Sequence, residues 1–150
     1  MSLEITADAA RKDEATVVNG TRAYNRTQTP KDVESLCVFD RLDSGEIVGG
    51  LTGKTFWNYL EIAYLWVDEA YRMQGRARAI MIAAENEALK RGCHNVLLDT
   101  YSFQALAFYK GLGYVEFGEI DDFSGEHTRY YLRKRLSPPS GDSGVVERVD

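Results

Sequence analysis

Residues 67–78 have the sequence Val67-Asp68-Glu69-Ala70-Tyr71-Arg72-Met73-Gln74-Gly75-Arg76-Ala77-Arg78, in which an apolar segment gives way to a short loop and then to arginines and small residues. The pattern predicts the end of a buried strand, a turn and the start of a helix. Free backbone N–H groups at a helix N-terminus, with the positive end of the helix dipole, form an anion site. Gly75 and Ala77 leave that turn open to a phosphate, and three side chains add positive charge: Arg72, Arg76 and Arg78. An arginine-rich, solvated start of a helix is the simpler alternative.

Three apolar segments precede this loop and predict an antiparallel meander. They span residues 35–42, 46–55 and 59–68, with a turn at Asp43-Ser44-Gly45 between the first two. The third segment is apolar or aromatic at nearly every position, which is typical of a strand covered on both faces. Nearer the N-terminus, residues 3–6 are a candidate strand, and Asp8 is a candidate N-cap for a helix over residues 9–25.

Downstream of the loop, the apolar positions change to helical spacing. Residues 75–91 predict a helix from the apolar positions Ala77, Ile80, Met81, Ala84 and Ala88. Residues 95–101 predict a buried strand, Ser102 is a candidate cap for a second helix ending at Lys110, and residues 114–120 and 128–136 predict a final strand pair. A strand–helix–strand unit makes a right-handed crossover between parallel strands. We therefore expect an α/β (α+β) fold with a mixed sheet.

The composition fits a single domain without a bound metal. The chain has 150 residues, 18 Lys and Arg against 23 Asp and Glu, and a formal net charge of -5. We expect one domain over residues 1–136 and a flexible C-terminal tail over residues 137–150. An acidic chain has no global field that attracts nucleic acid or an anionic membrane, and no apolar run reaches the roughly 20 residues of a membrane helix. Neither the cysteines nor the histidines are spaced as metal ligands, and without a signal peptide pattern we expect a cytoplasmic protein.

Two motifs together resemble the GNAT superfamily of N-acetyltransferases. The first, Arg72-Met-Gln-Gly75-Arg-Ala77, fits that family's Gln/Arg-x-x-Gly-x-Gly/Ala signature. The second, Ser102-Phe-Gln-Ala-Leu-Ala-Phe-Tyr109-Lys-Gly-Leu-Gly113-Tyr114, resembles the family's later helix, which ends in a Phe-Tyr-x-x-x-Gly-Phe/Tyr pattern. The order of the expected elements also follows the family. The resemblance implies a central, mostly antiparallel sheet with a splayed parallel strand pair, flanked by helices.

The same resemblance implies that acetyl-CoA binds between the splayed strands. The pyrophosphate would lie on the amides from Arg72 to Ala77, and the pantetheine arm would pair with main-chain groups near Val67, because unpaired backbone groups at a splay need partners. The family often has Asn where this chain has Ser102, so the contact with the cofactor arm falls to Ser102, Thr100 or Gln104. The cofactor-binding residues implied in this way are Leu65, Trp66, Val67, Arg72, Met73, Gln74, Gly75, Arg76, Ala77, Arg78, Thr100, Ser102, Gln104, Phe108 and Tyr109.

The implied reaction is direct transfer of the acetyl group from the thioester to a primary amine. A lysine-like amine has a pKa of about 10.4, so it loses a proton before it attacks. The amide of Val67 would stabilise the oxyanion that forms, and Tyr109 would protonate the departing thiolate as general acid, unless it only packs its helix onto the sheet. Glu61 is the candidate base, with a pKa raised by desolvation, or else a surface charge; Asp99 is the second candidate. Strand alternation places Glu61 on the same face as Leu65 and Val67.

No motif identifies the acceptor amine, which the resemblance leaves open between a small molecule and a peptide. In this family the acceptor pocket is built by residues that correspond here to 20–34 and 118–130, where Asp121, Asp122 and Glu126 would attract a cationic amine. Two other functions fit the sequence: a non-catalytic acetyl-CoA-binding sensor or scaffold, which has no need of the Tyr109 phenol, and a domain whose arginines bind an acidic protein. A homodimer is a further expectation.

Overall fold

The computed structural model describes residues 1–30 and 32–137. The chain divides into two compact units, Met1–Asp32 and Val33–Asp150. In the first unit, helix α1 (Arg11–Arg26) confirms the predicted helix, but its N-cap is Ala10 and Asp8 does not cap it. The strand predicted over residues 3–6 is wrong, because no strand of the described residues pairs with this segment. Residues 138–150 of the predicted tail lie outside the described residues, and a single domain over residues 1–136 stays a prediction.

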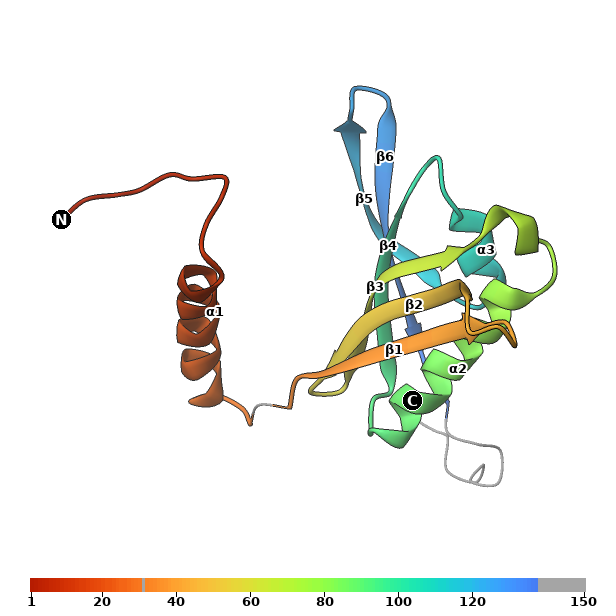
Figure 1. Ribbon diagram of the computed structural model, residues 1–150, viewed down its shortest axis with the longest axis horizontal. Coiled ribbons are helices and arrows are strands. Elements are labelled where there is room, and N and C mark those ends of the chain that lie inside the picture. Colours follow the sequence, from red (N-terminus) through yellow and green to blue (C-terminus); the bar gives the residue numbers. More distant parts are fainter. Residues whose placement is uncertain (31, 138–150) are drawn as a thin grey trace. The chain divides into compact units, whose positions relative to one another are not determined.

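The second unit is built on a six-stranded mixed sheet with the order β1-β2-β3-β4-β6-β5 (Figure 1). Its strands are β1 (Glu34–Arg41), β2 (Ile47–Phe56), β3 (Tyr59–Val67), β4 (Asn95–Tyr101), β5 (Val115–Phe123) and β6 (His127–Arg135). β3 and β4 pair in parallel, and the other neighbours in this sheet pair antiparallel. This arrangement confirms the predicted mixed α/β fold and its meander, crossover and final strand pair.

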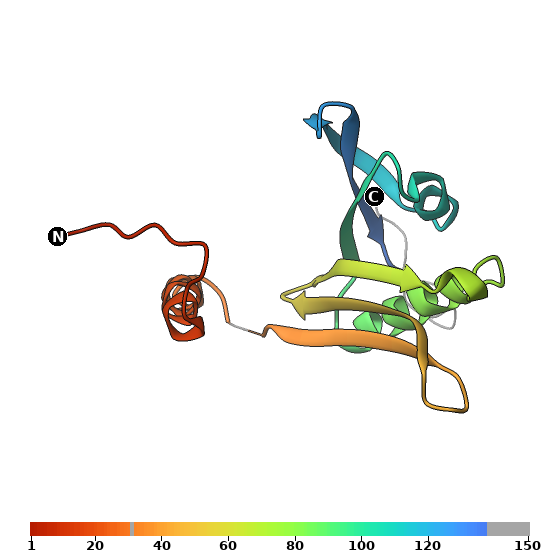
Figure 2. The same cartoon turned by 45° about the horizontal axis from the view of Figure 1, so that its top comes forward.

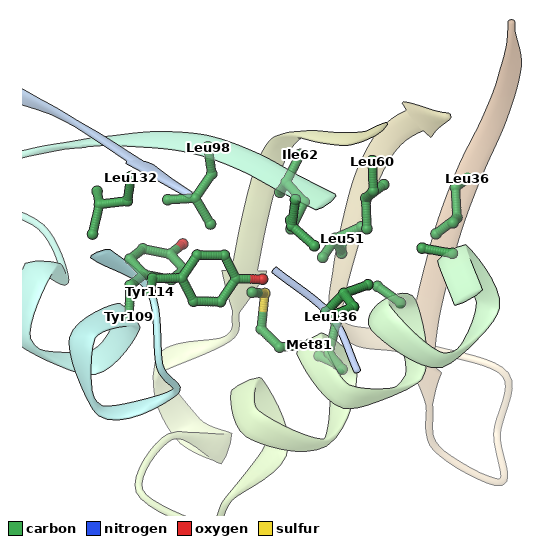
Figure 3. Close-up of a cluster of buried hydrophobic side chains, with 14 of the residues drawn as sticks. Leu36, Leu51, Leu60, Ile62, Met81, Leu98, Tyr109, Tyr114, Leu132 and Leu136 are labelled. Carbon is green, nitrogen blue, oxygen red and sulfur yellow. The ribbon is translucent and has the colours of Figure 1, made fainter. Parts of the chain in front are cut away.

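Two helices pack on one face of this sheet. α2 (Arg76–Lys90) contacts β1, β2 and β3 (Figure 2), and α3 (Leu106–Gly111) follows β4. Both contribute to one core, in which Met81 of α2 and Tyr109 of α3 lie among side chains from the sheet such as Leu60, Leu98 and Leu132 (Figure 3). Of these two helices, α3 begins later in the chain than the sequence predicted.

Ser102 does not cap α3, which begins only at Leu106. The Ser102 hydroxyl instead accepts a hydrogen bond from the Thr128 N–H at 3.1 Å, and the Ser102 N–H donates to the Thr128 carbonyl at 2.8 Å. The prediction of a cap at Ser102 was wrong because β6 competes successfully for the same polar groups.

A β-bulge at Ala63 changes which side chains of β3 face the core. Thr52 pairs with Tyr64 and Gly53 pairs with Ile62, so Ala63 has no partner on β2. The extra residue reverses the alternation: Leu60 and Ile62 are buried before the bulge, and Leu65 and Val67 pack against the same core after it. The prediction that Glu61 shares a face with Leu65 and Val67 is therefore wrong.

In the described part of the second unit, helices pack against only one face of β3. Tyr64 is 77% exposed and Trp66 is 49% exposed. We call this side of the sheet, opposite α2 and α3, the open face. The coverage of β3 on both faces stays a prediction.

The parallel ladder between β3 and β4 is short. It joins Tyr59 to Asn95, Leu60 to Val96 and Glu61 to Leu97, and it ends two residues before the bulge. β3 then continues beside β2 while β4 continues beside β6 along its full length, so the two strands diverge (Figure 1). A bulge bends its strand and increases the local twist, which accounts for the divergence at this point. The splayed parallel pair is thus present between residues 62–67 and 98–101.

Replacing Gly53 with alanine tests whether the bulge is under steric control. A Cβ atom at Gly53 would lie 2.5 Å from the Glu61 carbonyl oxygen and 3.2 Å from Ile62 Cα, so the backbone of β3 would have to move. We expect Gly53→Ala to lower the free energy of unfolding by about 1–3 kcal/mol, as overpacking does, measured by urea denaturation. Gly118→Ala on β5 is the matched control, because nothing lies within 4 Å of its Cβ position. Equal stability of the two variants would contradict the assignment.

Candidate functional site

A cavity of about 950 Å³ fills the space between the diverging strands. It is lined by residues of β3, the loop after it, the start of α2, β4, the segment leading into α3, α3 itself and β6: Glu61, Ile62, Ala63, Tyr64, Leu65, Trp66, Val67, Arg72, Ala77, Leu97, Leu98, Asp99, Thr100, Tyr101, Phe103, Gln104, Ala105, Phe108, Tyr109, Arg129 and Tyr131. Because the ladder has ended here, the facing edges of β3 and β4 present backbone polar groups without strand partners on that side.

The cavity passes through the sheet from one face to the other. On β4, Leu98 and Thr100 are buried on the helix side, whereas Asp99 and Tyr101 alternate with them and belong to the open face. All four line the cavity. A ligand that enters between α2 and α3 can therefore meet a second ligand that approaches from the open face.

The start of α2 closes one end of the cavity with the geometry of an anion site. Gly75 caps the helix in the left-handed conformation with φ 77°, and Met73 is also left-handed with φ 63°. The first helical hydrogen bond runs from the Ala79 N–H to the Gly75 carbonyl at 3.1 Å, so the amides of residues 76–78 precede the ladder. The first turn has no acidic residue, and the Cβ position of Gly75 meets no atom within 4 Å. These amides are free to bind an anion.

The three arginines of the loop differ in their contacts. Arg72 lines the cavity, and its Nε donates to the Val67 carbonyl at 2.9 Å, which fixes the end of β3. Arg76 instead forms an ion pair with Asp40 of β1 at 2.7 Å and stacks over the Tyr71 ring at 5.1 Å. Arg76 and Arg78 do not line the cavity. Of these three arginines, Arg72 alone therefore belongs to the described lining of the cavity.

The structure brings most of the residues inferred from the sequence together around the cavity. Ten of them line it: Glu61, Leu65, Trp66, Val67, Arg72, Ala77, Thr100, Gln104, Phe108 and Tyr109. Six do not: Met73, Gln74, Gly75, Arg76, Arg78 and Ser102. Three residues were candidates to replace the family's Asn in the contact with the cofactor arm. Two of them are hydrogen-bonded to each other, because Thr100 Oγ1 donates to Gln104 Oε1 at 3.2 Å.

Tyr109 is a buried phenol on the helix side of the cavity. Its side chain is 8% exposed, and its ring lies 5.2 Å from that of Phe108 and 6.0 Å from that of Tyr114 (Figure 3). Burial raises the pKa of Tyr109 above 10.0, and the negative charge of Asp99 raises it further. The phenol is therefore a proton donor at neutral pH rather than a phenolate.

A hydrogen-bonded group of three side chains lies next to Tyr109. The Tyr114 hydroxyl donates to Glu85 of α2 at 2.7 Å, and Lys134 of β6 donates to the other oxygen of that carboxylate at 2.9 Å. Burial, followed by the charge and hydrogen bond of Glu85, raises the pKa of Tyr114. The group joins α2, the segment between α3 and β5, and β6 next to the cavity.

The two carboxylates that line the cavity come from the two diverging strands. Glu61 has a side chain that is 40% exposed and lies 3.5 Å from Lys54 Nζ, so it is not the desolvated carboxylate that its apolar neighbours suggested. Asp99 accepts a hydrogen bond from Arg129 Nε at 2.8 Å. Both carboxylates belong to the open face, on the side from which a second ligand would approach.

Sequence reasoning missed the contribution of β6 to the cavity. Arg129 and Tyr131 line it beside Tyr101 and Phe103, whereas the acidic residues of the β5–β6 hairpin that we expected near the acceptor do not. The register that sets Arg129 opposite Tyr101 and Tyr131 opposite Asp99 cannot be read from the sequence, because it depends on pairing between distant strands.

Two other kinds of site are not found in the part of the chain that the structure describes, residues 1–30 and 32–137. Its His, Cys, Asp and Glu side chains form no group of three or more that could hold a metal ion. None of its helices is long and apolar enough to span a membrane.

Comparison with known proteins gives one consistent family. Residues 7–114 match the sequence model of the acetyltransferase (GNAT) family. Acetyltransferase Atu2258 of Agrobacterium fabrum is 35% identical over 115 residues, which are 76% of this chain and 84% of that protein. Blasticidin-S acetyltransferase of Streptomyces morookaense is 32% identical over 118 residues, which are 77% of this chain and 87% of that protein.

Solved structures give the same fold. A crystal structure from Agrobacterium tumefaciens has a TM-score of 0.85 and 31% identity, covering 91% of this chain and all of that one (100%). A structure from Bacillus anthracis in complex with acetyl coenzyme A has a TM-score of 0.60 and 23% identity, covering 68% of this chain and 62% of that one. At that identity the second likeness concerns the fold alone.

The raised pKa values of Tyr109 and Tyr114 predict a loss of stability in alkali. Above about pH 10 the unfolded phenols ionise while the folded ones keep their protons, so the unfolded state binds fewer protons and the free energy of unfolding falls as the pH rises. Each group contributes at most about 1.4 kcal/mol per pH unit. Urea denaturation at about pH 8 and about pH 11 should show a smaller fall for Tyr109→Phe than for the wild type.

Tyr64→Phe is the control for this measurement, because the Tyr64 side chain is 77% exposed in the folded state. The same pH dependence in wild type and Tyr109→Phe would show that the buried phenol does not keep its proton.

Proposed function

Because the chain belongs to the acetyltransferase (GNAT) family, we propose that it transfers the acetyl group of acetyl-CoA directly to a primary amine of a small molecule or peptide. One observation carries the proposal: the β3–β4 ladder ends after three pairs, and the cavity that follows joins the start of α2 to the open face. A donor and an acceptor can thus bind on opposite sides of one slot. This arrangement suits direct transfer, which requires both substrates at once.

The helix side of the cavity fits the donor. A diphosphate would bind the amides at residues 76–78, where the helix dipole favours negative charge and Gly75 leaves room. An extended, amide-containing arm would pair with the unpaired edges of β3 and β4 near Leu65, Trp66 and Val67. The Bacillus anthracis protein binds acetyl coenzyme A, and this chain offers the same kind of ligand an anion site and two free strand edges.

The cavity offers both a proton donor and proton acceptors for the acetyl transfer. Tyr109 keeps its phenolic proton at neutral pH and lines the cavity between the strands, so it can protonate a departing thiolate. Glu61 and Asp99 lie on the open face, where one of them would take the proton of the attacking amine, directly or through water. The amide of Val67, at the end of β3, would stabilise negative charge on the reacting carbonyl oxygen.

The alternatives from the sequence are less well supported. A sensor or scaffold that only binds acetyl-CoA has no use for a slot that opens on the far side of the sheet or for a buried phenol lining it. A domain that binds an acidic protein through its arginines would need Arg76, whose charge is already paired with Asp40. The homodimer and the cytoplasmic location remain predictions.

Acetyl-CoA should raise the melting temperature of the protein, whereas NAD and ATP should not. A ligand at a hundredfold excess over its Kd stabilises the folded state by about 2.7 kcal/mol. Ala77→Asp, at a position that lines the cavity, should reduce the shift by placing a negative charge beside the diphosphate. Ala79→Asp is the control, because it adds the same charge to the same turn outside the cavity lining. The absence of any shift at millimolar acetyl-CoA would refute the donor assignment.

Tyr109→Phe should lower the rate of acetylation about a hundredfold or more, since it removes only the proton donor and keeps the ring. The affinity for CoA, measured by calorimetry, should stay close to that of the wild type. Tyr130→Phe is the control, because Tyr130 also packs against the core but does not line the cavity, and its rate should equal that of the wild type. Equal rates for Tyr109→Phe and wild type would remove Tyr109 as the acid.

A further inference from the structure

Arg129 is held firmly on the open-face side of the cavity and still has unused hydrogen-bond donors. Its Nε donates to Asp99 Oδ2 at 2.8 Å. Its guanidinium carbon lies 5.2 Å from the ring centre of Tyr131, 5.6 Å from that of Tyr101 and 6.0 Å from that of Phe123. Within residues 1–30 and 32–137, the terminal nitrogens Nη1 and Nη2 have no hydrogen-bond partner.

The strand register explains why Arg129 is held in this position. Tyr101 of β4 lies opposite Arg129 of β6, and Asp99 lies opposite Tyr131, so the Arg129–Asp99 ion pair is a diagonal contact between neighbouring strands. Arg129, Asp99, Tyr101 and Tyr131 all line the cavity. The side chain is thus fixed before any ligand binds, which reduces the entropy lost on binding.

A guanidinium that is fixed in place and keeps two terminal nitrogens without partners is suited to bind a carboxylate. Its N–H groups form a planar fork that matches two carboxylate oxygens, and Asp99 occupies only Nε, which leaves the outer edge with Nη1 and Nη2. The aromatic rings around it limit its rotation and its hydration. A fork held at the cavity wall therefore has the geometry to bind a second carboxylate, provided by a ligand.

The other charged side chains that line the cavity favour a ligand with a carboxylate over a polycation. The two carboxylates that line the cavity, Glu61 and Asp99, are each already paired, with Lys54 at 3.5 Å and with Arg129 at 2.8 Å. The other lining cation, Arg72, has no carboxylate partner among the described residues. Among the described lining residues, no carboxylate is left unpaired to bind a polyamine, whereas the arginine side chains can donate hydrogen bonds to an anionic group.

We propose that Arg129 binds a carboxylate of the acceptor, so that the acceptor is an amino-acid-like amine that carries both a reactive amino group and a carboxylate. The inference rests on the proposed function and specifies its acceptor. Arg129 is a binding residue in this assignment, and Asp99 orients it. A purely structural Arg129 would only join β4 to β6, and its loss would change stability without changing the choice of acceptor.

The test uses matched pairs of acceptors: amino acids, including phenylalanine, lysine and arginine, and the carboxamide of each. The readout is the ratio of kcat/KM for the acid to that for its amide, which cancels effects of the variant on catalysis in general. We expect the wild type to prefer the acid for at least one pair. Arg129→Gln should lower that ratio about ten- to a hundredfold, mainly through KM, as the loss of hydrogen bonds between charged groups does.

Two further variants keep the test decisive. Arg133→Gln is the matched control, because Arg133 is exposed on the same strand and does not line the cavity; its ratio should equal that of the wild type. Arg129→Lys keeps the charge and can replace Arg129→Gln if the latter does not fold. Without the planar fork, its ratio should fall between those of the wild type and Arg129→Gln.

An unchanged ratio in both Arg129 variants, or an equal loss in Arg133→Gln, would overturn the assignment. A wild type that acetylates only amides or simple amines would also overturn it. In either case a melting shift with acetyl-CoA leaves the proposed function standing. Failure of that function is recognised separately, by the absence of both the shift and acetylation of any amine.

Discussion

The parallel ladder between β3 and β4 ends at the pair of Glu61 and Leu97, and the rest of the site depends on that ending. Each strand keeps its other neighbour, so the sheet does not come apart and the core beneath it stays continuous. The bulge at Ala63 supplies the bend and also turns Tyr64 and Trp66 to the open face while Leu65 and Val67 return to the core. One inserted residue thereby opens the sheet and distributes the walls of the cavity between its two faces.

A buried charged group holds three segments together beside the opened sheet. Glu85 of α2 is buried and accepts hydrogen bonds from Tyr114, which lies between α3 and β5, and from Lys134 of β6. A buried carboxylate left without donors would cost several kcal/mol in desolvation, so the three groups have to stay together. Their position fixes α2, which carries the proposed anion site, relative to Tyr109, the proposed proton donor. The distance between these two groups is thus set in the core rather than at the cavity.

Local patterns in the sequence were sufficient for most of the helices and strands and for part of the cavity lining. The change from a continuous apolar segment to helical spacing around residues 67–78 located the turn and the start of α2, and the motif around Tyr109 located the second wall. The other half depended on pairing over long range. Arg129 reaches Asp99 only because β6 pairs antiparallel with β4 in one particular register, and Glu61 leaves the face of Val67 only because of an unpaired residue on β3. A shift of one residue in either ladder would have given opposite neighbours.

The same limit applies to the arginines of the loop. In the sequence, Arg72, Arg76 and Arg78 are three equal charges around a helix start. In the structure, Arg72 holds the carbonyl at the end of β3 and Arg76 joins the loop to Asp40 of β1, so their hydrogen bonds shape the loop that presents the amides. Arg129, by contrast, has its place fixed by a carboxylate and three rings and keeps its outer donors free. In a chain with a net charge of -5, the candidate anion-binding groups therefore lie where oriented N–H groups meet the cavity, at both of its sides, and not where positive residues are most frequent.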